Sequence, residues 1–207
     1  MTYLTEQEKF WANDFGNDYP NRNGGEKMIS SNLALFSKIF KNCPTVHSVA
    51  ELGCNIGLNL IALNRINQQL KLRGYEINEK ATLVAREQNI AEIVNTTVVE
   101  TLDASQKFDL TFTKGVLIHI NPDMLPVVYQ NLYNLSNRYI MICEYYNPAP
   151  VSIEYRGNKD KLYKRDFAGE LISKFDLKLI DYGFNYHLDT YHTNDDSTWF
   201  LLEKKYS

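Results

Sequence analysis

The chain has 207 residues, of which 44% are hydrophobic and 23% charged, a composition typical of one soluble globular unit with a sizeable core. A formal net charge of -3 and an isoelectric point near 5.8 provide no broad basic surface, so we expect no nucleic-acid partner. Its three cysteines include no C-x-x-C pair, which argues against a thiolate zinc site and a disulfide framework and indicates a reducing compartment.

Residues 1–16 contain acids and an early tryptophan, instead of the basic and then apolar regions of an export signal. No apolar run approaches the length that crosses a bilayer. We therefore expect a cytoplasmic protein with no membrane partner.

The N-terminal part, residues 1–45, is predicted to form a helical cap. Residues 24–42 place Ile29, Leu33, Phe36 and Phe40 on one helical face. Such a face packs on the sheet or covers a cofactor.

Residues 46–145 alternate between predicted strands and helices, which implies a parallel sheet covered on both faces. The residue types predict strands at 47–54, 71–78, 95–102, 107–120 and 138–146, with helices at 57–68, 79–90 and 121–136.

The C-terminal part begins with residues 146–166, a substrate-side loop of mixed charge in which 147–164 form an ordered loop or small insertion. Residues 167–207 are predicted to form a C-terminal helix and hairpin. The helical pattern spans 165–175, and two strands at 177–186 and 197–205 are predicted to pair antiparallel. The whole chain, 1–207, is thus predicted to be one doubly wound α/β domain. Its sheet has seven strands, mostly parallel, with an antiparallel C-terminal strand and helices on both faces.

The segment "ELGCNIGLNL" crosses from the first predicted strand of this core to its helix and indicates a nucleotide-type cofactor loop. Glycines at Gly53 and Gly57 let a ligand approach the backbone. Asn55 and Leu58 stand where a G-x-G-x-x-G dinucleotide loop has its other glycines, so NAD and FAD are disfavoured.

Two acids at strand ends favour a different cofactor. Glu51 precedes Gly53 by two residues and would repel a pyrophosphate, but it suits the cationic tail of S-adenosylmethionine (SAM). Glu76 ends the second strand of the core, near the spacing at which an acid binds ribose hydroxyls. SAM is therefore the predicted cofactor.

Residues beside these acids and at neighbouring strand ends complete the predicted cofactor site. Glu100 and Thr101 are placed at the adenine edge, and Lys114 and Gly115 beside the methionine moiety. The other predicted members are Cys54, Asn55, Ile77, Tyr19 and Arg22. Tyr19 and Arg22 are expected to close over the cofactor, and Trp11 either joins them or packs in the core.

This order of parts along residues 46–120 resembles the class I SAM-dependent methyltransferases, with Glu51, Gly53, Gly57 and Glu76 at matching positions. Four longer segments resemble the pseudaminic acid biosynthesis-associated methylase family: "QEKFWANDFGNDYPNRN", "ELGCNIGLNL", "FTKGVLIHINPD" and "CEYYNPAPVSIEYRGNKDKLYKRDFAGE". The resemblance implies a Rossmann-like methyltransferase domain and suggests an acceptor from nonulosonic acid biosynthesis.

Candidate catalytic residues lie at the ends of the fourth and fifth strands. His119 has a pKa suited to a general base, and Glu144 and Tyr145 stand at the substrate face. The alternatives are that His119 packs at a strand-helix junction and that Glu144 forms a structural ion pair.

The charged loop after the fifth strand supplies candidate substrate-binding residues. Arg156, Lys164 and Arg165 are predicted to bind a carboxylate or phosphate, with Tyr146 and Tyr155 stacking on a sugar or base. The alternative is a solvated loop whose field is diluted by acids. No metal is predicted, because His187 and His192 fit no standard ligand spacing.

The leading hypothesis is methyl transfer from SAM to O or N of a small, anionic, sugar-like metabolite, either a sugar acid or a nucleotide sugar. A nucleotide-dependent oxidoreductase is a second class, disfavoured by Asn55 and Leu58. A third is a non-catalytic protein of methyltransferase fold that binds a metabolite or a glycosylation enzyme. The sequence indicates no oligomeric state.

Overall fold

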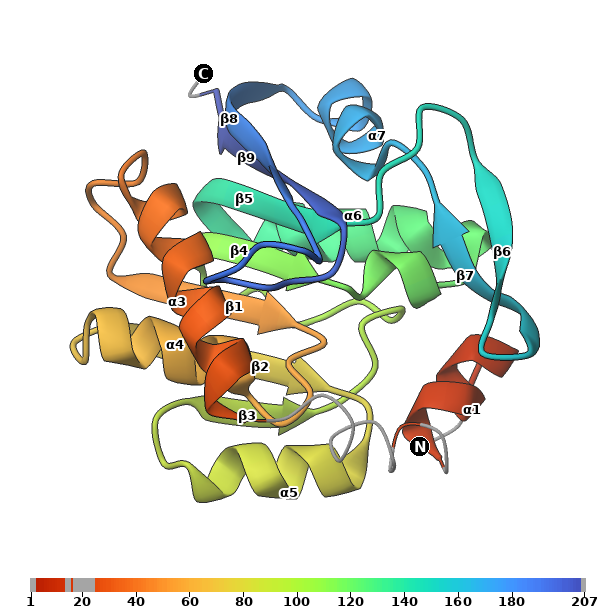
Figure 1. The fold of residues 1–207 in the computed structure, drawn as a ribbon, viewed down its shortest axis with the longest axis horizontal. Coiled ribbons are helices and arrows are strands. Elements are labelled where there is room, and N and C mark those ends of the chain that lie inside the picture. The colour runs from red at the N-terminus through yellow and green to blue at the C-terminus, as the bar shows by residue number, and fades with distance from the viewer. Residues whose placement is uncertain (1–2, 14–15, 17–24, 206–207) are drawn as a thin grey trace.

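The computed structural model describes residues 3–13, 16 and 25–205 (Figure 1). Its strands are β1 (Ser48–Leu52), β2 (Lys71–Glu76), β3 (Glu92–Asn95), β4 (Phe108–Lys114), β5 (Ser136–Glu144), β6 (Val151–Tyr155), β7 (Asn158–Lys164), β8 (Leu177–Asn185) and β9 (Ser197–Lys204). Its helices are α1 (Glu6–Ala12), α3 (Glu26–Phe40), α4 (Leu58–Ile66), α5 (Glu79–Glu87), α6 (Leu125–Leu135) and α7 (Phe167–Lys174), with 3-10 turns η1 (Leu117–His119) and η2 (Pro122–Met124).

Seven strands form one sheet in the order β3-β2-β1-β4-β5-β9-β8. The pairs from β3 to β5 are parallel, and β9 runs antiparallel to both β5 and β8. The predicted doubly wound α/β fold with an antiparallel C-terminal strand is confirmed. Because β1 lies between β2 and β4, the loop that leaves its carboxyl end faces the loops of both neighbours, which is where open α/β sheets bind ligands.

Helices cover both faces of the sheet, and alternate residues of β1 show why (Figure 1). Val49 belongs to the core under α3 and α4, whereas Ala50 belongs to the core under α6 and α7. Of the predicted N-terminal helical face, Ile29 is buried and Phe36 is fully buried. The Phe36 ring meets the sheet edge-on at Phe112, 5.2 Å between centroids. Each such aromatic or aliphatic side chain stabilises the fold by about 1.5–3 kcal/mol.

The third strand lies earlier than predicted. Residues 95–102 were expected to form it on their β-branched content, but β3 ends at Asn95. Its neighbour β2 ends at Glu76, the register partner of Asn95, so the chain beyond has no strand to pair with. Asn95 Nδ2 instead donates to the carbonyl of Glu76 at 2.9 Å and to that of Ile77 at 3.2 Å. The fourth strand likewise ends at Lys114, and the residues to Ile120 form η1 and its flanks.

The predicted loop at 147–164 is a β-hairpin, β6–β7, that stands apart from the main sheet and close to α1 (Figure 1). Tyr155 pairs with Asn158 across a two-residue turn in which Arg156 and Gly157 both have positive φ, 50° and 80°. A turn of this kind matches the twist of the two flanking strands. In the sequence, the signal for this hairpin was the pair Arg156-Gly157 between two short segments of strand-forming residues.

Among the described residues, no helix combines the length and the apolar character required to cross a membrane.

Candidate functional site

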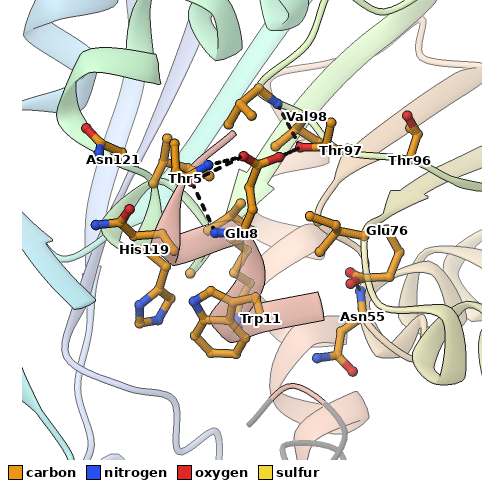
Figure 2. A pocket seen from close by; sticks show the side chains of 18 residues that line it. Thr5, Glu8, Trp11, Asn55, Glu76, Thr96, Thr97, Val98, His119 and Asn121 are labelled. Carbon is orange, nitrogen blue, oxygen red and sulfur yellow. Dashed lines mark hydrogen bonds between the residues drawn. The ribbon is translucent and has the colours of Figure 1, made fainter. Parts of the chain in front are cut away.

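A cavity of about 140 Å³ lies at the carboxyl ends of the parallel strands, with α1 forming one wall (Figure 2). The other walls come from loops that follow β1, β2, β3 and β4. The lining residues are Thr5, Gln7, Glu8 and Trp11 of the α1 region; Gly53, Asn55, Glu76 and Ile77; Thr96, Thr97, Val98 and Val99; and Lys114, Gly115, Val116, His119, Ile120 and Asn121.

The loop after β1 turns through three left-handed residues, Gly53, Asn55 and Gly57, with φ of 78°, 49° and 84°. A Cβ on Gly53 would lie 2.6 Å from a methyl group of Val116, so this position requires glycine. Asparagine is the side chain that best tolerates the left-handed region, and Asn55 Oδ1 accepts the N–H of Ile56 at 2.7 Å. Asn55 therefore follows the path of the glycine that it replaces.

Not all predicted loop residues reach the cavity. Gly53 and Asn55 line it, whereas Cys54 is buried against Gly74, and Gly57 is the N-cap of α4 away from the cavity wall. Burial raises the pKa of the Cys54 thiol well above its usual range, which keeps it protonated. The N-terminus of α4 is where a pyrophosphate would bind, and it is not part of this wall.

Glu76 lines the cavity and holds the surrounding backbone in place (Figure 2). One carboxylate oxygen accepts the N–H of Asn55 at 2.8 Å and the other that of Asn78, also at 2.8 Å. Burial raises the pKa of Glu76, and these backbone N–H groups oppose that shift. The side chain thus joins the glycine loop to the end of β2, with Ile77 beside it on the wall.

Glu51 is fully buried beneath the glycine loop and does not itself line the cavity. Asn59 Nδ2 donates to its Oε1 at 2.5 Å, and its Oε2 has no hydrogen-bond partner among the described residues. Burial raises the pKa of Glu51 to about 8, partly offset by the Asn59 hydrogen bond and the charge of Lys114. A buried acceptor without a partner costs about 1–3 kcal/mol, so this oxygen is suited to a donor or a cation.

The segment after β3 brings Thr96, Thr97, Val98 and Val99 to the wall. Glu100 and Thr101, predicted at the adenine edge, are exposed and lie outside the wall because β3 ends several residues early. The residues that line this part of the cavity therefore come immediately before the predicted ones in the sequence.

Lys114 at the end of β4 lines the cavity, as do Gly115 and His119 in the segment that follows. The His119 ring lies 4.5 Å from that of Trp11 and 4.9 Å from that of Tyr155, centroid to centroid. Burial lowers the pKa of His119 to about 4, so the imidazole is neutral near pH 7. Its Nδ1 lies 2.7 Å from the Lys161 carbonyl, which can only accept, so Nδ1 carries the proton and Nε2 the lone pair.

Glu144, a predicted catalytic residue, lies outside the cavity wall and is buried under the segment after β4. Its Oε2 accepts the N–H of Val116 at 3.0 Å and that of Ile118 at 3.4 Å. Burial raises the pKa of Glu144 to about 7. The described contacts of this carboxylate hold the loop that carries His119.

The predicted substrate-binding residues and Tyr145 also lie outside the cavity wall. Arg165 forms an ion pair with Glu170 at 2.5 Å, and the Lys164 ammonium lies over the Tyr145 ring at 5.3 Å. The Arg156 guanidinium lies over Tyr155, 5.7 Å from the ring centroid, and Tyr146 is 43% exposed beside Phe200. Of this set, Tyr155 contacts a residue of the cavity wall, because its ring lies beside that of His119.

From the α1 region, the sequence offered Trp11 as a residue that could close over the cofactor, whereas Thr5, Gln7 and Glu8 were missed. Thr5 and Glu8 form a capping box, and Glu8 Oε1 also accepts the hydroxyl of Thr97 at 2.7 Å. The pattern T-x-x-E was a readable signal for the start of this helix. It does not reveal that the helix closes a cavity.

Tyr19 and Arg22, which were predicted to close over the cofactor, lie outside the described residues. Within the described ranges, no three histidine, cysteine or acidic side chains are grouped so that they could hold a metal ion.

Searches with the sequence alone identified no relative: no family model and no curated protein matches the chain. Solved structures do match its fold. Magnesium protoporphyrin IX methyltransferase (ChlM) from Synechocystis PCC 6803 with bound SAM aligns with a TM-score of 0.69 at 13% identity, covering 99% of this chain and 100% of that one.

Two further structures agree. The plantazolicin methyltransferase BpumL in complex with SAH gives a TM-score of 0.65 at 15% identity, covering 96% of this chain and 94% of that one. A SAM-dependent methyltransferase from Clostridium acetobutylicum ATCC 824 gives 0.66 at 11% identity, covering 93% and 98%. The chain therefore has the Rossmann-like fold seen in class I SAM-dependent methyltransferases.

Proposed function

We propose that this protein is a SAM-dependent methyltransferase. The observation that carries the proposal is the Glu76 carboxylate in the cavity wall, which joins the glycine loop to the end of β2 where a ribose would be bound. The fold supports it, because structures that share the fold were solved with SAM or SAH bound.

The residues present suit this cofactor. SAM carries a sulfonium and an ammonium group, and the site offers two buried carboxylates, Glu51 and Glu76. Glu51 Oε2, which lacks a partner among the described residues, would accept from the ammonium group directly or through water. Gly53 and Asn55 expose loop backbone to the adenosyl part, and Thr97 and Val98 form the wall after β3.

When bound, SAM supplies a methyl group whose bond to sulfur breaks as the bond to the acceptor forms, leaving the electron pair on sulfur. Alignment of the acceptor supplies much of the rate in such a displacement. The lone pair of His119 Nε2 is available for the proton that leaves an acceptor O–H or N–H. Glu144 keeps the segment that carries His119 in place through the N–H groups of Val116 and Ile118.

We propose as acceptor the O or N of a small, anionic, sugar-like metabolite of a pseudaminic or other nonulosonic acid pathway. The support for this finer assignment is the resemblance of the flanking segments described above. The alternative is a protein of the same fold that binds a metabolite or a glycosylation-pathway enzyme without turnover. A dinucleotide oxidoreductase is disfavoured because Gly57, at the N-terminus of α4, is not on the cavity wall.

Calorimetric titration with SAM, SAH and NAD tests the proposal. We expect micromolar binding of both adenosyl ligands and none of NAD, because the wall presents carboxylates where a pyrophosphate would need backbone N–H groups. Release of SAH from SAM in a screen of sugar-like acceptors then separates an enzyme from a binding protein. Binding of NAD without SAM or SAH would contradict the assignment.

The buried Glu51 predicts that SAM binding releases a proton. The pKa of Glu51 in the free protein is raised to about 8, so the group is largely protonated at pH 7. A cationic ligand favours the ionised form and lowers that pKa, so SAM affinity should rise with pH until about 8 and then level off. Below the plateau the slope approaches about tenfold per pH unit.

The released proton is measured by titrating SAM at pH 7 in phosphate and in Tris, whose ionisation enthalpies differ. Glu51→Gln should abolish the buffer dependence of the heat. Glu144→Gln, which alters a buried carboxyl of raised pKa that lies outside the cavity wall, should retain it. Equal heats in the two buffers for the unmodified protein would contradict the role of Glu51.

A further inference from the structure

Gln7 of α1 and His119 of η1 are held by consecutive backbone carbonyls of β7. Gln7 Nε2 donates to the carbonyl of Asp160 at 3.0 Å, and His119 Nδ1 to that of Lys161 at 2.7 Å. Gln7 Nε2 also donates to the Tyr163 hydroxyl at 3.2 Å. Because a carbonyl accepts and never donates, the nitrogen of each side chain is assigned to the hairpin.

This arrangement leaves one acceptor atom on each side chain. Gln7 Oε1 is buried with no hydrogen-bond partner among the described residues. The His119 ring is held through Nδ1, which leaves the lone pair on Nε2. Both residues line the cavity, and each is only 7% exposed. A buried acceptor without a partner, such as Gln7 Oε1, costs about 1–3 kcal/mol, which a ligand with a suitable donor would remove.

The surroundings of the pair favour an uncharged ring. The Trp11 ring, 4.5 Å from the His119 ring, supplies a flat surface in the same wall. The acids among the described lining residues are Glu8 and Glu76, and Lys114 is the one lysine or arginine there. The charge of Lys114 lowers the pKa of Glu51, which lies under the glycine loop. A carboxylate or phosphate would therefore meet acceptors at this wall, whereas hydroxyl or N–H groups would meet partners.

Building on the proposed methyltransferase function, we propose that Gln7 Oε1 and His119 Nε2 together recognise two hydrogen-bond donors on an uncharged ring of the methyl acceptor. One donor is the hydroxyl or amine that is methylated, and it lies on His119. The other is a second hydroxyl or N–H of the same ring, and Gln7 selects for it. Any acidic group of the acceptor then lies outside this wall.

Three aromatic probes that differ only in their donors test the pair: 1,2-dihydroxybenzene, 2-methoxyphenol and 1,2-dimethoxybenzene. Their affinities for the SAH-loaded protein are measured by saturation-transfer NMR. We expect a loss of about 3–10-fold for each hydroxyl that is methylated, the size of one hydrogen bond. If SAH itself does not bind, the proposed function fails, and the same series on the protein alone still tests the acceptor pair.

Gln7→Met keeps the length of the side chain and removes its acceptor. It should therefore abolish one of the two losses of affinity, or steps, along the probe series. Gln88→Met, at an exposed glutamine after α5, is the matched control and should keep both steps. SAH affinity reports whether each variant is folded, and Gln7→Asn, which withdraws the same oxygen, replaces Gln7→Met if the latter is not. Equal affinities for the three probes, no binding of any probe, or unchanged steps in the Gln7 variant would overturn the proposal.

Discussion

Glu76→Ala is expected to weaken SAM binding by about 100-fold or more, the largest effect on affinity that we predict. The substitution removes the proposed ribose contact, and a hydrogen bond to a charged group contributes about 1.5–3 kcal/mol. It also leaves the N–H groups of Asn55 and Asn78 without their acceptor, so the glycine loop loses its link to the end of β2. The dissociation constant is measured by calorimetry.

Two control variants test whether the loss of SAM affinity is specific to the Glu76 carboxylate. Glu76→Gln keeps one acceptor oxygen but turns a donor toward a backbone N–H, so its affinity should fall between those of the unmodified protein and Glu76→Ala. Glu79→Ala removes a neighbouring exposed acid in the first turn of α5 and should leave affinity unchanged. An unaltered dissociation constant in Glu76→Ala would remove this residue from the cofactor site.

Glu144→Ala is expected to lower the free energy of unfolding by about 3 kcal/mol, because at least two buried N–H groups lose their acceptor. Those groups belong to Val116 and Ile118, whose segment forms part of the cavity wall. For a chain of this size the melting temperature should fall by about 6–12 °C. Thermal unfolding followed by circular dichroism measures it.

The pH dependence of stability separates the charge of Glu144 from its shape. Its pKa is raised in the folded protein from 4.5 to about 7, so its contribution is complete below pH 4.5 and is lost as pH rises through about 7. Glu144→Gln resembles the protonated form, and its stability relative to the unmodified protein should therefore increase across that window. Unchanged stability of Glu144→Ala together with lost turnover would instead favour a catalytic role.

The strand-loop-helix unit around Gly53 shows how far local patterns extend. The apolar run, the glycines and the helical face that follows are properties of adjacent residues, and they identify β1, its loop and α4. The same holds for Glu51 and Glu76, since an acid at the end of a strand keeps that place in any parallel sheet. The contacts of Glu51 Oε2 and the shared use of Glu76 by two loops depend on residues brought together by the sheet.

The end of β3 shows where local patterns fail. Thr96 to Val99 have the β-branched side chains of a strand, but strand formation needs a neighbour, and β2 has already ended at Glu76. As a result, Thr96 to Val99 line the cavity, whereas the predicted Glu100 and Thr101 do not. Arg165 was predicted to bind an anionic group from its charge alone, and the sequence does not show that it pairs with Glu170 of α7.

The sequence by itself determined the alternation of strands and helices, the glycine loop and the two acids, because periodicity and strand-end chemistry are local. Only the tertiary structure decided that α1 closes the cavity, that His119 is neutral with its lone pair on Nε2, and that Gln7 keeps an unpaired oxygen. Each of these depends on contacts between Gln7, Glu8 or His119 and residues 42 or more positions away. Burial and hydrogen-bond pairing over such separations are set by packing, which no single segment encodes.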